Sequence, residues 1–167
     1  MEIKVILDNI VNFDGDCIVN AANHTLLGGG GVDGAIHRSA GPELLAECRT
    51  LGGCETGQAK ITKGYDLLAK NVIHTVGPVY KTNTPFENEI LLARCYWNSL
   101  NVAKENDIHS IAFPAISTGA YAYPLDDATR IAASTVKQWL IQNNYDIDIT
   151  FVCYDDETYL AYVKYAK

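Results

Sequence analysis

The chain has 167 residues, of which 48% are apolar and 20% charged, and its formal net charge is −7 at pH 7. This composition is typical of one globular domain with a substantial core, and the acidic balance argues against nonspecific attraction of nucleic acid. No apolar run is long enough to span a membrane, and the scattered cysteines contain no Cys-x-x-Cys pair. A membrane partner, a zinc site and a disulfide framework are therefore not expected.

The pattern of apolar residues predicts alternating strands and helices along the chain. The N-terminal residues 1–5 resemble a strand more than a signal peptide, so we expect a cytoplasmic protein. The predicted strands are Ile3–Leu7, Asp16–Val19, Ala59–Thr62, Asn71–Val76, Ile111–Phe113 and Asp148–Cys153. The predicted helices are Asp33–Cys48, interrupted at Gly41-Pro42 and restarting near Glu43, then Glu87–Glu105, Asp127–Ile141 and Asp156–Tyr165.

This alternation predicts an α/β fold with a largely parallel sheet that is covered by helices on both faces. In such sheets the ligand lies beyond the carboxyl ends of the strands. We therefore expect the functional residues to follow directly after strands.

Four consecutive glycines, Gly28–Gly31, precede a predicted helix and are the most informative local feature. Glycines permit close approach of the backbone to a ligand, and a helix N-terminus directs N–H groups and a positive dipole end at an anion. The loop therefore predicts a phosphate site, although it matches neither a tight Rossmann turn nor a P-loop. Asp33 and His37 are four residues apart, which places both side chains on one helix face.

A second loop, residues 113–124, follows the strand Ile111–Phe113 and is rich in small residues. Its hydroxyl and N–H groups can supply further donors to an anion, so the two loops together suggest a diphosphate; the alternative is an ordinary polar connection. Tyr121 in this loop and Tyr154 after the last strand can each cover a sugar or base, or simply cap the core. Asn20 and Asn23 offer carboxamides for sugar recognition or for turn hydrogen bonds.

Together these motifs resemble the macrodomain family, in particular its MacroD-type branch and the bacterial O-acetyl-ADP-ribose deacetylases within it. The matching segments are Asn20–Asn23, Gly28–Ala40, Gly41-Pro42, Cys54–Thr62, Val72–Pro78, Phe113–Gly119 and Tyr123-Pro124. The resemblance spans nearly the whole chain. It implies one macrodomain over residues 1–167, a three-layer α/β/α fold and a mixed, largely parallel sheet of six or seven strands.

The resemblance also implies a cleft for ADP-ribose at the strand ends, with no metal and no cofactor. Its diphosphate would be bound by Gly28, Gly29, Gly30, Gly31 and Val32 together with Ser117, Thr118, Gly119, Ala120 and Tyr121. Asn9, Ile10, Ala22 and Tyr154 would complete the binding site, with Tyr154 beside the adenine and Tyr121 over the distal ribose. Asn23, Asp33 and His37 would be the catalytic residues, with Asn23 and Asp33 at the distal ribose and the hydrolytic water.

One segment departs from the family pattern. The family usually has Gly-Asp-Ile before Asn-Ala-Ala-Asn, with the aspartate on the adenine amine, whereas this chain has Asp8-Asn9-Ile10. Either Asn9 meets the amine through its carbonyl, or a one-residue shift places Asp8 there.

The resemblance implies hydrolysis of esters on the distal ribose, with O-acetyl-ADP-ribose and ADP-ribose on protein Asp or Glu as substrates. Either Asp33 or the diphosphate of the substrate would be the general base. The alternatives are a reader that binds ADP-ribose without cleaving it, a regulatory protein that binds another protein or RNA, and an ADP-ribose 1″-phosphate phosphatase. ADP-ribosylated proteins are the expected macromolecular partners.

Overall fold

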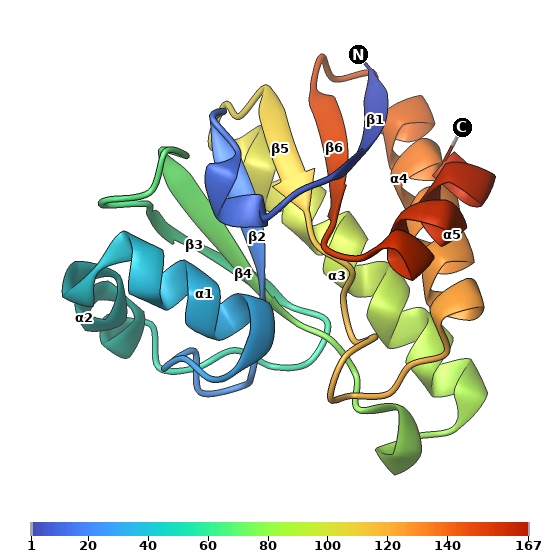
Figure 1. Ribbon diagram of the computed structural model, residues 1–167, viewed down its shortest axis with the longest axis horizontal. Coiled ribbons are helices and arrows are strands. Elements are labelled where there is room, and N and C mark those ends of the chain that lie inside the picture. The colour runs from blue at the N-terminus through green and yellow to red at the C-terminus, as the bar shows by residue number, and fades with distance from the viewer. Residues whose placement is uncertain (1, 167) are drawn as a thin grey trace.

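A six-stranded mixed sheet, in the order β1-β6-β5-β2-β4-β3, crosses the molecule in the computed structural model, which describes residues 2–166 (Figure 1). The strands are β1 Ile3–Leu7, β2 Cys17–Ala22, β3 Ala59–Lys63, β4 Asn71–Val76, β5 Ser110–Phe113 and β6 Asp148–Cys153. All neighbouring strands pair in parallel except β3 and β4, which are antiparallel. The mixed, largely parallel sheet expected from the sequence is confirmed.

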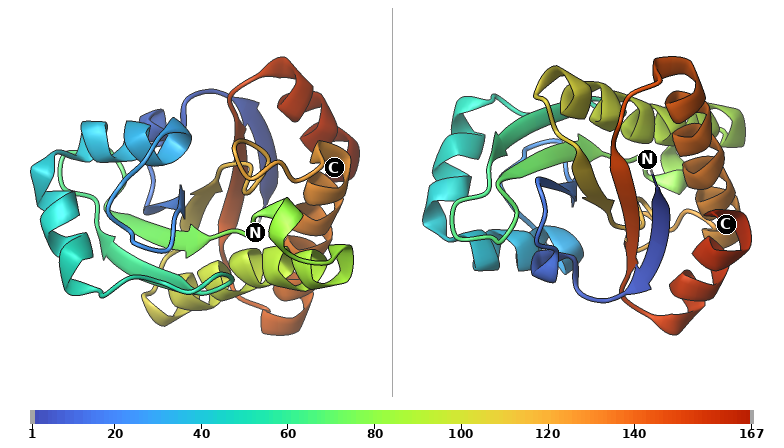
Figure 2. Two further views of the ribbon diagram at one scale, coloured as in Figure 1. Left: turned by 90° about the horizontal axis from the view of Figure 1, so that it is seen from below. Right: turned by 90° about the horizontal axis from the view of Figure 1, so that it is seen from above.

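Helices cover both faces of this sheet and give three layers (Figure 2). The α-helices are α1 Gly31–Ala40, α2 Pro42–Thr50, α3 Pro85–Glu105, α4 Leu125–Asn143 and α5 Asp156–Ala166, and two short 3-10 turns are η1 Ile10–Asn12 and η2 Tyr80–Thr82. Ile36 and Leu44 on α1 and α2 belong to one apolar core. Leu92, Trp139 and Tyr162 on α3, α4 and α5 belong to a second core on the opposite face.

The observed elements follow the sequence expectations closely, with two differences of boundary and a helix break at the expected place. Strand β2 continues to Ala22, so Asn20 lies inside the strand rather than after it. Helix α1 begins at Gly31, two residues earlier than expected. The break between α1 and α2 falls at Gly41, whose φ of +87° ends one helix and begins the next. A side chain at that φ would be strained, which is why glycine occupies the junction.

The five mutually parallel strands all end at one edge of the sheet. The segments that follow them are Asp8–Ile10 after β1, Asn23 after β2, Gly77 after β4, the loop 114–124 after β5, and Tyr154 after β6. This edge is therefore the place where the predicted functional residues meet, as the sequence suggested. Within residues 2–166, no helix has the length and apolar character needed to cross a bilayer.

Candidate ligand-binding and active site

A two-lobed cleft lies at the carboxyl edge of the sheet. Its two cavities have volumes of about 400 and 410 Å³ and share four lining residues, Gly31, Val32, Ala115 and Gly119. The first cavity, here called the Tyr154 lobe, is also lined by Asp8, Asn9, Ile10, Ala35, Arg38, Pro114, Thr118, Val152, Tyr154, Asp155 and Thr158. The second, the Tyr121 lobe, is also lined by Ala21, Ala22, Asn23, Gly30, Gly77, Ile116, Ser117, Ala120 and Tyr121. The shared residues form a neck between the two lobes.

One side of the neck is the N-terminus of α1. Gly30 precedes the helix as its N-cap and provides no side-chain hydrogen bond, while Gly31 has a φ of +58°. The first N–H groups of an α-helix have no acceptor within the helix, so Gly31 and Val32 offer theirs to whatever lies in the neck. Gly34 cannot be replaced by a larger residue without moving the loop, because a Cβ at this position would lie 2.5 Å from the carbonyl oxygen of Gly29. These glycines allow the loop to fold tightly against the start of α1.

The other side of the neck is the loop between β5 and α4. Ser117 has a φ of +67°, and its backbone oxygen accepts a hydrogen bond from Tyr123 N at 2.9 Å. The Ser117 hydroxyl is buried and makes no hydrogen bond to any described residue. A Cβ added to Gly77 would overlap Ser117 Oγ. Because Gly77 has no side chain, it leaves the room that this loop needs. The sequence did not identify Gly77 as a site residue, although its position directly after β4 could have indicated it.

Asp33 lies behind the glycine loop rather than on the cleft wall. Its side chain is buried, 4% of the residue is exposed, and it lines neither lobe. Asn20 Nδ2 donates a hydrogen bond to Asp33 Oδ1 at 2.9 Å, and His37 Nε2 lies 3.5 Å from the same oxygen. Burial raises the pKa of Asp33, an effect that the Asn20 hydrogen bond and His37 oppose. Direct contact of Asp33 with a ribose therefore stays a prediction.

The second carboxylate oxygen of Asp33 faces the glycine loop. A Cβ built on Gly29 would lie 3.2 Å from Asp33 Oδ2 and 3.4 Å from Asn23 Nδ2. Asp33 Oδ2 and the Asn23 amide therefore both lie close to Gly29, so this part of the glycine loop lies next to the Asp33 carboxylate. Asn23 itself donates from Nδ2 to Gly28 O at 2.9 Å and lines the Tyr121 lobe.

Asn20 connects Asp33 to a buried histidine in β4. Asn20 Nδ2 lies 3.1 Å from His74 Nδ1, and His74 Nε2 lies 2.9 Å from Thr62 Oγ1. Because both protons of the Asn20 amide are donated, Nδ1 accepts and Nε2 is the protonated nitrogen. Burial, reinforced by His37, lowers the pKa of His74 to about 3, so the ring is neutral. Nothing in the sequence indicated that His74 is connected to Asp33 through Asn20.

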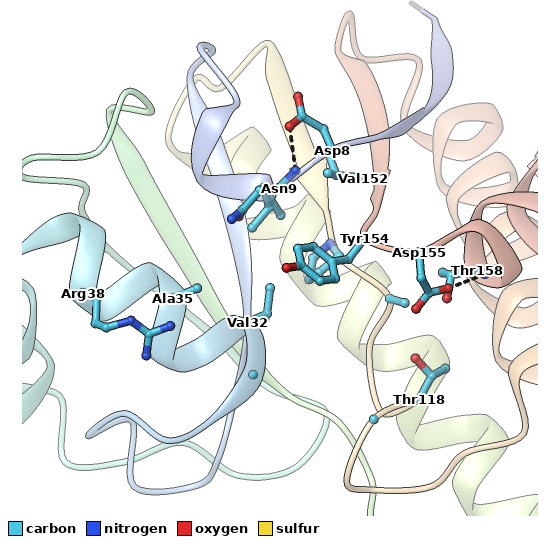
Figure 3. A pocket seen from close by; sticks show the side chains of 15 residues that line it. Asp8, Asn9, Val32, Ala35, Arg38, Thr118, Val152, Tyr154, Asp155 and Thr158 are labelled. Atoms are coloured by element: carbon cyan, nitrogen blue, oxygen red, sulfur yellow. Dashed lines mark hydrogen bonds between the residues drawn. The ribbon is translucent and has the colours of Figure 1, made fainter.

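Asn9 and Asp8 occupy the far wall of the Tyr154 lobe (Figure 3). Asn9 Oδ1 accepts a hydrogen bond from Val11 N at 3.2 Å, and Asp8 Oδ1 accepts from Asn9 N at 2.7 Å and from Asn12 Nδ2 at 2.9 Å. Figure 3 shows the Asp8 carboxylate directed away from Tyr154. The sequence suggested that the Asn9 carbonyl oxygen faces a base. In the structure this oxygen already caps η1 by accepting a hydrogen bond from Val11 N.

The structure brings most of the predicted site residues together. Of the predicted set, Asn9, Ile10, Ala22, Asn23, Gly30, Gly31, Val32, Ser117, Thr118, Gly119, Ala120, Tyr121 and Tyr154 line one or both lobes. Gly28, Gly29 and His37 instead line a shallow hollow on the opposite side of the glycine loop. Arg38, Asp155 and Thr158 line the Tyr154 lobe and were not predicted. Arg38 lies in the last turn of α1, Thr158 in the first turn of α5 and Asp155 between β6 and α5, where the sequence alone does not give side-chain direction.

The remaining groups of interest are the possible metal ligands and the cysteines. Within residues 2–166, no cluster of three or more His, Cys, Asp or Glu side chains has the arrangement of a metal site. All five cysteines are free and buried. Burial raises the pKa of Cys48 to about 11, and of Cys95 and Cys153 to about 12.

Comparison with known proteins relates this cleft to a family. The Macro domain family model matches residues 19–132. A macro domain-containing protein of Methanosarcina mazei is 56% identical over 156 residues, which cover 93% of this chain and 83% of that protein. Human MACROD2, named an ADP-ribose glycohydrolase, is 58% identical over 138 residues, which cover 83% of this chain but 32% of MACROD2. This chain thus spans about a third of the length of MACROD2.

Solved structures agree with this match. A Trypanosoma brucei macrodomain crystallised in complex with ADP-ribose superposes with a TM-score of 0.90 at 44% identity, covering 98% of this chain and 68% of that one. The resemblance identified from the sequence and the fold class expected from it are both confirmed. The matched sequence, the three-layer architecture and the cleft at the strand ends establish that this chain belongs to the Macro domain family.

Proposed function

We propose that this chain binds ADP-ribose in the two-lobed cleft and hydrolyses esters on its distal ribose. The proposal depends above all on one observation: the two lobes are joined by a neck made of Gly31, Val32, Ala115 and Gly119. ADP-ribose matches this shape, because its diphosphate joins an adenosine to a second ribose. The diphosphate charge would lie in the neck, where the helix N-terminus offers free N–H groups. The names of MACROD2 and of the Trypanosoma brucei complex support the same ligand.

In this proposal the adenosine half occupies the Tyr154 lobe and the distal ribose occupies the Tyr121 lobe. Tyr154 is 81% exposed, so its ring is free to pack over a base. Tyr121 is half-buried and lines its lobe, and its backbone oxygen accepts from Tyr80 N at 3.0 Å, which holds this part of the loop in place. Asn23 reaches the same lobe from the end of β2 and supplies an amide to the ribose hydroxyls.

Hydrolysis requires a water molecule placed against the ester carbonyl carbon. The water oxygen forms the new bond to that carbon and its proton passes to a base. The bond from the carbon to the ribose oxygen then breaks, and the base returns the proton to that oxygen, which leaves as the ribose hydroxyl. Asp33 is our candidate for that base, acting from behind Gly29, and the substrate diphosphate is the other. His37 Nε2 lies 3.5 Å from Asp33 Oδ1 without a hydrogen bond, close enough to orient or assist the carboxylate in this proposal.

The proposed substrates are O-acetyl-ADP-ribose and ADP-ribose joined to protein Asp or Glu side chains, which makes ADP-ribosylated proteins the proposed partners. The test is a paired measurement on one sample: calorimetric titration with ADP-ribose, then acetate release from O-acetyl-ADP-ribose. We expect binding in the micromolar range or tighter, with acetate as product. Absence of binding would contradict the whole proposal, while release of phosphate from the 1″-phosphate would indicate the phosphatase activity instead.

A reader that binds without cleaving is the second candidate, and one observation favours it. Asp33 is buried, already bound by Asn20, and does not line the Tyr121 lobe. Binding without acetate release, repeated with a protein-linked ADP-ribose ester, would establish this reader function and refute the catalytic role of Asp33.

A further inference from the structure

Asn9 presents an unpaired hydrogen-bond donor to the Tyr154 lobe. Its Oδ1 accepts from Val11 N at 3.2 Å, which fixes the orientation of the carboxamide, because the reverse orientation would set two N–H groups against each other. Among the described residues, Nδ2 of Asn9 has no hydrogen-bond partner. Asn9 is half-buried and lines the cavity, so this NH₂ group is what the side chain offers to a ligand.

The two carboxylates that line the lobe each hold one oxygen in local hydrogen bonds. Asp8 Oδ1 accepts two hydrogen bonds within its own turn, and Asp155 Oδ1 accepts from Thr158 N at 2.8 Å. Figure 3 shows Asp8 directed away from Tyr154 and Asp155 turned toward Thr158. Arg38, which also lines the lobe, adds donors and no acceptor.

Adenine and the 6-oxopurines differ at position 6 in whether the group there donates or accepts a hydrogen bond. A donor from Asn9 can distinguish these two cases. Adenine carries an amine there, which is a donor, whereas guanine carries a carbonyl, which is an acceptor; both have an acceptor at N7. A donor from Asn9 can pair with N7 of either class and with the carbonyl of a 6-oxopurine, but never with the amine of adenine. An aspartate at the same position would cap Val11 with one oxygen and present the other as an acceptor for the amine.

On these grounds we propose that the cleft accepts 6-oxopurine counterparts of ADP-ribose at least as well as ADP-ribose itself, with Asn9 as the residue that determines this base tolerance. The inference rests on the proposed function, because it assumes that the base occupies the Tyr154 lobe. It widens the substrate class of the same site from adenine to purine diphosphate-riboses.

The test compares ADP-ribose with its hypoxanthine counterpart, which carries a carbonyl in place of the amine at position 6 and an N–H in place of the acceptor at N1. Calorimetry on the wild-type protein should give dissociation constants whose ratio, hypoxanthine form over adenine form, is one or less. In Asn9→Asp this ratio should rise about tenfold, the value of one exchanged hydrogen bond. Gln142→Glu makes the same amide-to-carboxylate change at an exposed position near the end of α4, and it should leave the ratio unaltered.

The outcomes separate this inference from the proposed function. Wild-type protein that binds ADP-ribose but rejects the hypoxanthine form tenfold or more would overturn the inference alone. An unchanged ratio in Asn9→Asp would also overturn it, because another group would then be reading position 6. Failure of the wild-type protein to bind either compound would overturn both the inference and the proposed function.

Discussion

At the scale of single residues, burial decides the chemistry of the candidate site. Asp33 and His74 are both titratable, both almost fully buried, and both joined to the Asn20 amide. Burial disfavours the charged form of each group, so the pKa of the acid is raised and that of the base is lowered. Each shift has a measurable consequence.

Replacing Asp33 with Asn should lower ester hydrolysis by at least about a hundredfold, the usual contribution of a positioned base. The fold should persist, because Asn has the same shape and can accept from Asn20. Wild-type activity should rise with pH through a pKa above the ordinary aspartate range, and this rise should vanish in the variant. A pH profile of acetate release measures both effects, with exposed Asp14→Asn as the control. Undiminished turnover in Asp33→Asn would remove this residue from the reaction.

His74 should destabilise the folded protein in acid. Its pKa in the folded state is about 3 against an ordinary value of 6.5, so between these values only the unfolded chain takes up the proton. Stability should therefore fall as the pH falls through this window, by about 1.4 kcal/mol per pH unit. Urea unfolding of His74→Gln should show a shallower acid slope by that amount.

His109→Gln is the matched control for this slope, because His109 is exposed and its pKa is raised by its hydrogen bond to the Asp146 carbonyl. Its removal should not flatten the acid side of the curve. An equal slope in wild type and His74→Gln would mean that His74 titrates normally in the folded protein.

At the scale of elements, the neck depends on how closely the loop after β5 lies against the end of β4. Gly77→Ala would place a methyl group where Ser117 Oγ lies, and the loop would have to move outward. We expect ADP-ribose binding to weaken about tenfold, since a displaced loop loses at least one hydrogen bond to the ligand. Ser117→Gly in the same background removes the closest overlap, leaves the 2.7 Å approach to Ile116 Cγ2, and suits the φ of +67°, so it should restore part of the binding. A calorimetric double-mutant cycle measures the coupling, and additive effects would contradict the proposed contact.

The elements themselves were largely predictable, and the exceptions have physical causes. Apolar runs predicted β1, β4 and β6 to the residue; β4 and β6 are almost fully buried, which leaves little choice of boundary. The glycine run predicted the start of a helix, and α1 begins at its last residue, Gly31. The direction of the Asp33 side chain was not predictable, because it depends on β2 continuing to Ala22, which brings Asn20 inside the strand and under α1. The two 3-10 turns were missed because three-residue turns leave no periodic signal.

At the scale of the whole molecule, the acidic charge and the proposed anionic ligand are of the same sign. The net charge is −7, so attraction must come from the local N–H groups of the neck and from Arg38 rather than from the overall field. Raising the salt concentration screens the unfavourable overall repulsion as well as the local attraction. We expect the dissociation constant of ADP-ribose to change by less than about threefold between about 50 and 500 mM NaCl. A loss of about tenfold, measured by calorimetry, would indicate a site dominated by cationic side chains.

The position of the diphosphate in the neck is the central claim, and backbone amide shifts during an NMR titration with ADP-ribose test it most directly. We predict the largest shifts at Gly31, Val32 and Gly119, the residues whose amides border both lobes. Amides of the hollow behind the loop, such as Gly34 and Leu45, should move less. Small shifts at the neck together with large shifts elsewhere would contradict the account and place the ligand at another site.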